Sequence, residues 1–367
     1  MDTITLADGR LVRPPIPHQH PTPLPHQPQL QLQQEQQEDS SILLARDWSE
    51  PVRLTRKNLA LFNKMAGHDS EPTESLETGS LKMSSSTTIS TKMSGFARRA
   101  TENGILSLHN SQLPKNIDSI RRRYAAPRAT PSPTQSEFED YATKNQGDPN
   151  EATVMARFQR FLLKSFKGAY IQVFNRQFTG FPTGVGFNDG LSAAQPDFVE
   201  GLAKPGKWPL EVRGIGGAVL HAGDLNSIVL PHIAGEFQRP GGQMEAAEVQ
   251  ARYDGAALTY ARNQALAEMD TADAPANAHV TTFATDGNSL HIYAHYTDSE
   301  GRYHQSPVES TAINSHERYK LGQRMIRNAQ QHAREESYRL RDQLEAHYQK
   351  HREGASNDEA LRLKRQC

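Results

Sequence analysis

The chain has one cysteine, Cys367, and no long apolar segment. A single cysteine cannot form an internal disulfide, so the sequence lacks the framework of a disulfide-stabilised secreted domain. No apolar run approaches the roughly 18 residues that span a membrane, and the first residues lack the basic-then-apolar order of a signal peptide. We therefore expect an intracellular protein, nuclear or cytoplasmic, with no membrane partner.

Hydrophobic residues are also scarce. They make up 36% of the 367 residues, and the mean hydropathy of −0.71 is low for a fully folded chain of this length. Lys and Arg number 41 against 42 Asp and Glu, so the net charge argues neither for nor against a nucleic-acid partner. We expect a large part of the chain to lie outside a packed core.

This scarcity is concentrated in the first third of the chain. Its beginning is rich in Pro, His and Gln, and such a segment has too little apolar surface to offset the entropy lost on ordering. The first folded pattern begins near Ser136. We predict a largely disordered arm over 1–135, a folded α/β domain over 136–352 and a flexible tail over 353–367.

Three features of the arm stand out from this background. Residues 52–65 carry the pattern of a short amphipathic helix. Two basic clusters follow, Arg98-Arg99 and Arg121-Arg122-Arg123, which are either solvated charge, phosphate contacts or a nuclear-import signal.

The folded segment alternates between helical and strand patterns. Apolar residues recur at helical spacing in three stretches, and the stretches between them alternate or run continuously apolar. We predict, in chain order, a helix over 150–165, strands over 170–174, 198–199 and 228–237, a helix over 244–268, strands over 278–284 and 290–296 joined by a tight turn at 286–288, and a helix over 315–350. The result is an αβββαβ order with an added β-hairpin and a long C-terminal helix.

The last of these helices has a thin apolar stripe. Tyr319, Ile326, Ala333 and Leu340 recur every seven residues in an otherwise polar stretch. The stripe favours packing on the domain over a coiled coil.

Two acidic residues stand at the ends of predicted strands. Asp197 immediately precedes the strand Phe198-Val199, and Glu236 lies near the end of the strand over 228–237. Carboxylates on neighbouring strands can share a divalent cation, because carboxylate oxygen suits Mg²⁺ and Mn²⁺. An isolated acid at such a position is usually solvated, so the prediction of a metal site depends on the order of the helices and strands around the pair.

Four sequence blocks resemble an uncharacterised family common in filamentous fungi. The blocks are 181–192 (FPTGVGFNDGLS), Gln195-Pro196-Asp197, 230–236 (LPHIAGE) and 253–256 (YDGA). The segment is also distantly similar to PD-(D/E)XK nucleases, whose restriction-endonuclease-like core has the same αβββαβ order. This resemblance implies a metal-dependent nuclease that hydrolyses phosphodiester bonds of DNA or RNA.

The resemblance also implies a metal site. Asp197 and Glu236 would hold Mg²⁺ or Mn²⁺, with the carbonyl of Phe237 as a further ligand. Glu151, on the first helix, would add a carboxylate or hold an outer-shell water. A divalent ion held in this way polarises a phosphate and lowers the pKa of bound water.

The chain departs from the nuclease pattern at one position. Gln238 takes the place of the Lys that orients the attacking water, and an amide can hydrogen-bond a water but carries no positive charge. Arg239 is adjacent, but on a strand it points to the opposite face. Gln250 and Tyr253 are auxiliary candidates on the second long helix, although they are three residues apart where related exonucleases have a spacing of four.

Three classes of function remain open. The first is the nuclease, and the second is a catalytically degenerate nuclease fold that binds nucleic acid or a protein partner. The third is a scaffold without nucleic-acid contact, because the domain has no long basic stripe. A transition-metal site at His279, His291 and His295 is conceivable, but without Cys or a fixed third ligand these are more simply core or surface residues.

Overall fold

The computed structural model describes most of the chain from residue 88 onward. The described residues are 88–147, 149–203, 212–224 and 227–366, with two short antiparallel strands near the start, β1 (Ile4–Thr5) and β2 (Leu11–Val12). The chain divides into two compact units, Met1–Lys82 and Met83–Cys367. The amphipathic helix predicted over 52–65 lies outside the described residues.

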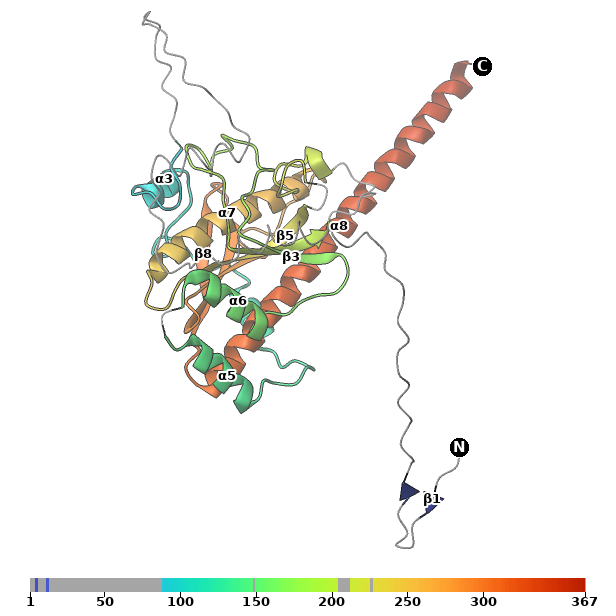
Figure 1. The fold of residues 1–367 in the computed structure, drawn as a ribbon. Coiled ribbons are helices and arrows are strands. Elements are labelled where there is room, and N and C mark those ends of the chain that lie inside the picture. The colour runs from blue at the N-terminus through green and yellow to red at the C-terminus, as the bar shows by residue number, and fades with distance from the viewer. Residues whose placement is uncertain are drawn as a thin grey trace, which may run out of the picture. The chain divides into compact units, whose positions relative to one another are not determined.

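A mixed sheet forms the centre of the second unit (Figure 1). Among the described residues it has six strands, which lie side by side in chain order. They are β3 (Tyr170–Phe174), β4 (Phe198–Ala203), β5 (Ile228–Phe237), β6 (Val280–Thr285), β7 (Ser289–Thr297) and β8 (Tyr303–Ala312). β5 and β6 are parallel and the other neighbours are antiparallel. The predicted mixed α/β class is therefore confirmed.

Helices cover both faces of this sheet. One face, the α7 face, packs against α3 (Phe96–Glu102) and α7 (Met244–Ala267), which connects β5 to β6. The other, the α8 face, packs against the remaining helices, α4 (Ile117–Ala125), α5 (Gln135–Asn145), α6 (Glu151–Phe161) and α8 (His316–Gln366). Figure 1 shows α8 crossing beneath the strands and continuing beyond them.

Local sequence signals explain where the helices begin and how closely they pack. The Thr134 hydroxyl accepts a hydrogen bond from Glu137 N, and the Glu137 carboxylate accepts one from Thr134 N, which forms a capping box at the start of α5. In α7, Gly255 lies against the His295 ring, and a Cβ at this glycine would be 2.2 Å from that ring. The small residues of α7 thus let the helix approach the sheet, as its sequence indicates.

Part of the segment expected to be disordered belongs to the core. α3 and α4 both lie before residue 136, and their apolar side chains Phe96, Ile120 and Tyr124 are buried. Each helix contributes only two or three apolar residues, so their signal is lost in the surrounding polar sequence. The cluster Arg121-Arg122-Arg123 is part of α4, and Arg121 donates to the carbonyls of Val308 and Pro307.

The C-terminal part also differs from the prediction in two respects. β8 was not predicted, because its sequence is polar and includes Pro307; it is an edge strand, where proline is tolerated, and its register shifts beside Tyr293. α8 continues to Gln366, through the expected tail. Its apolar stripe, including Ile326 and Ala333, is buried against the domain as predicted. Within the described part of the chain, no helix has the length and apolar character to cross a bilayer.

Candidate active site

The two acids at the strand ends face each other across β4 and β5. Phe198 pairs with Gly235 in this antiparallel pair, so Asp197, one residue earlier, lies opposite Glu236. The Asp197 carboxylate Oδ2 accepts a hydrogen bond from Phe237 N at 2.8 Å. The structure therefore brings together the two residues that the sequence nominated, at the end of β5.

A third acid, Asp254, joins them from α7. Its carboxyl group and that of Glu236 share a hydrogen bond, so one of the two must keep a proton. The side chain of Glu236 is 1% exposed and that of Asp254 is 2% exposed, whereas Asp197 is half-buried. Solvent therefore reaches this group of carboxylates chiefly through Asp197.

Burial and mutual repulsion raise the pKa values of all three acids. Burial, and to a lesser extent the charge of Glu151, raise the pKa of Asp197 to about 6 against the hydrogen bond from Phe237 N. Burial raises the pKa of Asp254 to about 7. For Glu236, burial and then the charges of Asp254 and Asp197 hold the pKa well above its usual range. Buried carboxyl groups that repel one another in this way are typical of sites that bind a cation or handle protons.

Apart from the proton shared by Glu236 and Asp254, two oxygen atoms in this group have no hydrogen-bond partner among the described residues. They are Glu236 Oε1 and Asp254 Oδ2, both buried. A buried carboxylate oxygen without a partner is costly, and a cation or a bound water would satisfy it. These atoms therefore fit a divalent cation as well as a proton.

The geometry limits how many protein ligands such a cation can have. Among the described residues, no group of three or more His, Cys, Asp or Glu side chains is spaced to surround a metal ion. The pKa shifts show that Asp197, Glu236 and Asp254 are near one another, which is a weaker condition than shared coordination. Mg²⁺ is commonly held by one or two carboxylates, with water and phosphate oxygen completing its shell. The pair Asp197 and Glu236 meets that requirement.

Two charged residues from other elements lie within electrostatic range of Asp197. Glu151, at the start of α6, raises the pKa of Asp197. Lys92 lowers that pKa. Lys92 is exposed and follows Ile89, whose backbone pairs with Gly190 and Ser192 just upstream of Asp197. Lys92 thus provides a positive charge near Asp197, which no residue of β5 provides.

The predicted water-orienting residue Gln238 and the auxiliary candidates Gln250 and Tyr253 are placed differently from one another. Gln238 follows β5, its backbone N donates to Thr285 O at 2.8 Å, and its side chain lies beside Gly242 in the next turn. Gln250 is half-buried on α7. The Tyr253 hydroxyl donates to Ser192 O at 2.8 Å. Tyr253 thus anchors the loop before Asp197, and Asp254 is the α7 residue that reaches Glu236.

Glu200 lies near Asp197 in sequence but belongs to the opposite face. Its carboxyl oxygen Oε2 accepts hydrogen bonds from Gln172 at 3.1 Å and Gln330 at 3.0 Å, beneath α8. Burial raises the pKa of Glu200 to about 8. Glu200 is therefore a neutral, hydrogen-bonded core acid and does not join the Asp197 group.

The three histidines considered as metal ligands have separate partners. His291 lies 2.9 Å from Glu248 and His295 lies 2.7 Å from the Thr282 hydroxyl. His279 lies between Asp273 and Glu336. They therefore do not converge on one site.

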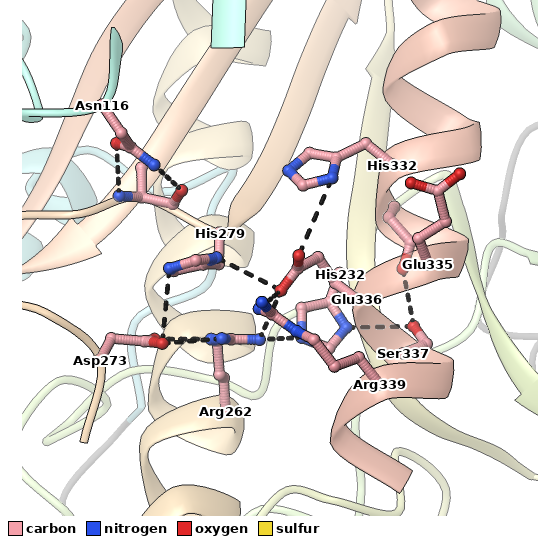
Figure 2. Close-up of polar contacts among 12 residues, drawn as sticks. Asn116, His232, Arg262, Asp273, His279, His332, Glu335, Glu336, Ser337 and Arg339 are labelled. Carbon is pink, nitrogen blue, oxygen red and sulfur yellow. Dashed lines mark hydrogen bonds and ion pairs between the residues drawn. The ribbon is translucent and has the colours of Figure 1, made fainter. Parts of the chain in front are cut away.

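His279 belongs to a second polar cluster, shown in Figure 2. At its centre Arg262 contacts Asp273 and also lies 3.2 Å from a Glu336 oxygen and 2.9 Å from His232. Arg262 comes from α7, Glu336 from α8 and His232 from β5, so the cluster ties both helical layers to the sheet. Its charges are mutually compensated, which distinguishes it from the Asp197 group, where negative charge dominates.

Sequence reasoning missed Asp254 and Lys92 for different reasons. Asp254 lies three residues after Ala251 and four before Leu258, so a helical projection places it on the buried face of α7. A charged residue on a buried stripe is a detectable signal. Lys92 carries no such signal, because only tertiary pairing of its segment brings it near Asp197.

Comparisons with known proteins add no family assignment. A scan against protein-family models finds no match to this chain, and a search of curated proteins finds no significant similarity. The family resemblance drawn from the four sequence blocks stays a prediction.

Proposed function

We propose that the protein is a metal-dependent nuclease that hydrolyses phosphodiester bonds of DNA or RNA at Asp197 and Glu236. One observation carries the proposal. Two carboxylates lie opposite each other at the ends of adjacent strands, in a group whose pKa values are raised and whose buried oxygen atoms Glu236 Oε1 and Asp254 Oδ2 have no partner among the described residues apart from the proton that these two carboxyl groups share. Such a group favours a divalent cation over a closed internal network.

The order of elements supports a PD-(D/E)XK-like core. α6 precedes the antiparallel strands β3, β4 and β5, and α7 then leads to β6, which is parallel to β5. This is the αβββαβ order that the resemblance implies. In that comparison Asp197 and Glu236 occupy the positions of the paired metal ligands.

The residues of the site have distinct proposed roles. Asp197 and Glu236 would hold Mg²⁺ or Mn²⁺, which supplies Lewis-acid polarisation of the phosphate and acidification of a bound water. Asp254 shares a proton with Glu236, and loss of that proton frees carboxylate oxygen for a cation. Glu151 would hold an outer-shell water.

Two further residues would replace the absent strand lysine. Gln238 can position a water through its amide, and Lys92 can provide positive charge beside Asp197. In this arrangement two residues share the work that one lysine usually does: the Gln238 amide orients the attacking water, and the Lys92 ammonium stabilises negative charge.

A second proposal is a degenerate nuclease fold that binds nucleic acid or a protein without cleaving. It is favoured by Gln238 in place of Lys and by the deep burial of Glu236 and Asp254. Under this proposal Glu236 and Asp254 have raised pKa values because the two carboxyl groups share one proton permanently and bind no metal.

The test uses the full-length protein, because α3 and α4 are part of the core. Plasmid, single-stranded DNA and RNA are incubated with it in Mg²⁺ or Mn²⁺, beside an Asp197→Ala/Glu236→Ala variant and an Asp118→Ala/Glu309→Ala control that removes two exposed acids. The nuclease proposal predicts cleavage that is lost only in the first variant.

Thermal unfolding with and without Mn²⁺ separates the two proposals. A metal-dependent rise in Tm in the wild type but not in Asp197→Ala/Glu236→Ala, without cleavage even after Gln238→Lys, supports the degenerate fold. If the protein shows no cleavage and its Tm does not change with Mn²⁺, the metal site itself is overturned.

A further inference from the structure

A group of positive charges lies on the α8 face, away from the carboxylates. Arg128 follows α4, Lys164 follows α6, and Arg327 and Arg334 project from α8. Burial lowers the pKa of Lys164, and the positive charges of Arg128, Arg334 and Arg327 lower it further. The three arginines therefore lie within electrostatic range of Lys164.

These cations lack anionic partners. Arg327 donates to the Leu162 carbonyl at 2.9 Å and Arg128 to the Asn328 side-chain oxygen at 2.6 Å, both neutral acceptors. Arg128 Nε and Arg334 Nε have no hydrogen-bond partner. Within the described residues, none of the four forms an ion pair with a carboxylate. These four residues therefore form a net positive group, although the charge of Glu137 acts on Arg327, and Arg341, further along α8, is paired with Asp342.

Aromatic rings alternate with cations along the same surface. Lys164 Nζ lies 4.8 Å from the centre of the Phe166 ring. The Arg334 guanidinium lies 5.4 Å from the Phe166 ring and 5.0 Å from the Tyr338 ring. The Arg341 guanidinium lies 4.6 Å from the centre of the Tyr338 ring. We call this series, Lys164, Phe166, Arg334, Tyr338 and Arg341, the cation–aromatic ladder.

A shallow groove runs along α8 beside the ladder. It has a volume of 730 Å³, and its lining includes two cations, Arg334 and Arg339, and two acids, Glu335 and Asp342, together with Tyr338 and Gln343. Arg334, Tyr338 and Phe166 are half-buried, so they are accessible but held by their neighbours. Preorganised side chains of this kind lose little entropy on binding.

The chemistry of the ladder matches one kind of partner. Phosphates would neutralise the unpaired cations, and exposed bases would stack on guanidinium planes and tyrosine rings. A duplex presents phosphates but keeps its bases stacked inside, and an acidic protein surface lacks a regular supply of flat rings. The combination of cations and rings therefore favours a single strand.

We propose that the cation–aromatic ladder binds single-stranded nucleic acid through phosphates and bases, without sequence preference. This proposal goes beyond the nuclease proposal, because the ladder is separate from Asp197 and Glu236. It holds whether or not those acids cleave.

Fluorescence anisotropy of the full-length protein in EDTA tests it without any cleavage. Labelled single-stranded DNA and RNA of about 20 nucleotides and a matched duplex are titrated at several NaCl concentrations. We expect Lys164→Glu/Arg334→Glu to weaken single-strand binding at least about tenfold and to make the plot of log affinity against log salt less steep by about 1.4, because two phosphate contacts are lost.

Two further variants separate charge from stacking. Tyr338→Leu should weaken binding about fivefold or more with little change in salt dependence. Arg318→Glu/Arg352→Glu, which reverses two exposed charges elsewhere on α8, should bind nearly as the wild type does. Circular dichroism and Tm establish that each variant is folded, and Lys164→Gln/Arg334→Gln repeats the test without introduced acids.

Several results would overturn the proposal. These are equal loss of affinity in the ladder and control variants, tighter binding of the duplex than of the single strand, or unchanged affinity in Tyr338→Leu. Binding to anionic phosphatidylserine vesicles without binding to oligonucleotides would also overturn it.

Discussion

Arg262 donates hydrogen bonds to both carboxylate oxygens of Asp273, from Nε at 2.6 Å to one and from Nη2 at 2.7 Å to the other. The remaining nitrogen, Nη1, faces Glu336 and His232, and the Arg262 side chain is only 4% exposed. One guanidinium therefore pairs with two carboxylates and joins α7 to α8.

Removing Arg262 should destabilise the protein strongly. We expect Arg262→Met to lower the free energy of unfolding by about 3–5 kcal/mol, because Glu336 and Asp273 would be left without their main partner in a mostly buried position. Urea unfolding followed by circular dichroism measures the change. Lys320→Met, which removes an ion pair to the exposed Glu317, should cost less than about 1 kcal/mol. Equal losses in the two variants would contradict the central role of Arg262.

Asp197 and Asp254 should make the metal-free protein less stable as pH rises, whereas buried histidines such as His295 and His332, whose pKa values burial lowers, contribute in the opposite sense below about pH 7. A carboxyl group whose pKa is raised in the folded state holds its proton more tightly there than in the unfolded chain. Its stabilisation is fully present below the unfolded pKa, near 4, and is lost as pH rises through the folded values of about 6 for Asp197 and about 7 for Asp254. Urea unfolding in EDTA should show this decline from about pH 7 to about pH 8, where histidines of the unfolded chain are already neutral.

Asp254→Asn tests the origin of that decline. The variant cannot ionise at this position, so the loss of stability from about pH 7 to about pH 8 should be smaller than in the wild type. Asp118→Asn, at an exposed position, should leave the pH dependence unchanged. An unchanged slope in Asp254→Asn would show that Asp254 does not contribute.

The contact between Gly235 and Phe283 should tolerate no side chain. A Cβ at Gly235 would lie 2.1 Å from the Phe283 ring, so Gly235→Ala should force β5 and β6 to shift and should cost about 1–3 kcal/mol. Gly214→Ala is a suitable control, because its Cβ would meet no atom within 4 Å. Because Glu236 is the next residue, Gly235→Ala should also reduce any metal-dependent rise in Tm. Normal stability in this variant would mean that Phe283 can move aside.

If the nuclease proposal holds, Lys92 should affect both rate and pH dependence. We expect Lys92→Ala to lower kcat at least about tenfold, Lys92→Arg to restore much of it, and Lys115→Ala, another exposed lysine, to have no effect. Lys92 lowers the pKa of Asp197, so its removal should move the acidic limb of the pH–rate profile to higher pH. A fall in kcat without that movement would assign Lys92 a role away from Asp197.

The sequence predicts the central part of the fold well, because its signals there are local. β5 is mostly apolar, and α7 has small residues at helical spacing after the turn Pro240-Gly241-Gly242. Asp197 and Glu236 mark strand ends, and chain order alone makes their strands neighbours. Such features can be predicted from the two-residue repeat of a strand and the 3.6-residue repeat of a helix.

The elements that the sequence did not predict depend on tertiary contacts. β8 is polar and contains Pro307, so it becomes a strand only because β7 offers an open edge. α4 has few apolar residues, and its Tyr124 is buried through a hydrogen bond to Thr281 and contacts with α8. Lys92 reaches the acids because Ile89 pairs with the loop at Gly190. In each case the deciding partner is more than 90 residues away or lies on another strand.

The described sheet is two antiparallel meanders, β3 to β5 and β6 to β8, joined along the parallel pair of β5 and β6. Each meander joins strands that are neighbours in the chain, whereas the parallel pair must wait for α7 to close its crossover. Asp197, Glu236 and Asp254 all leave the ribosome before β6. Their carboxylates are therefore solvated and ionised in the early folding species, and they lose water only when the second meander docks. We expect that docking step to be the point in folding at which acidity or divalent cations set the rate.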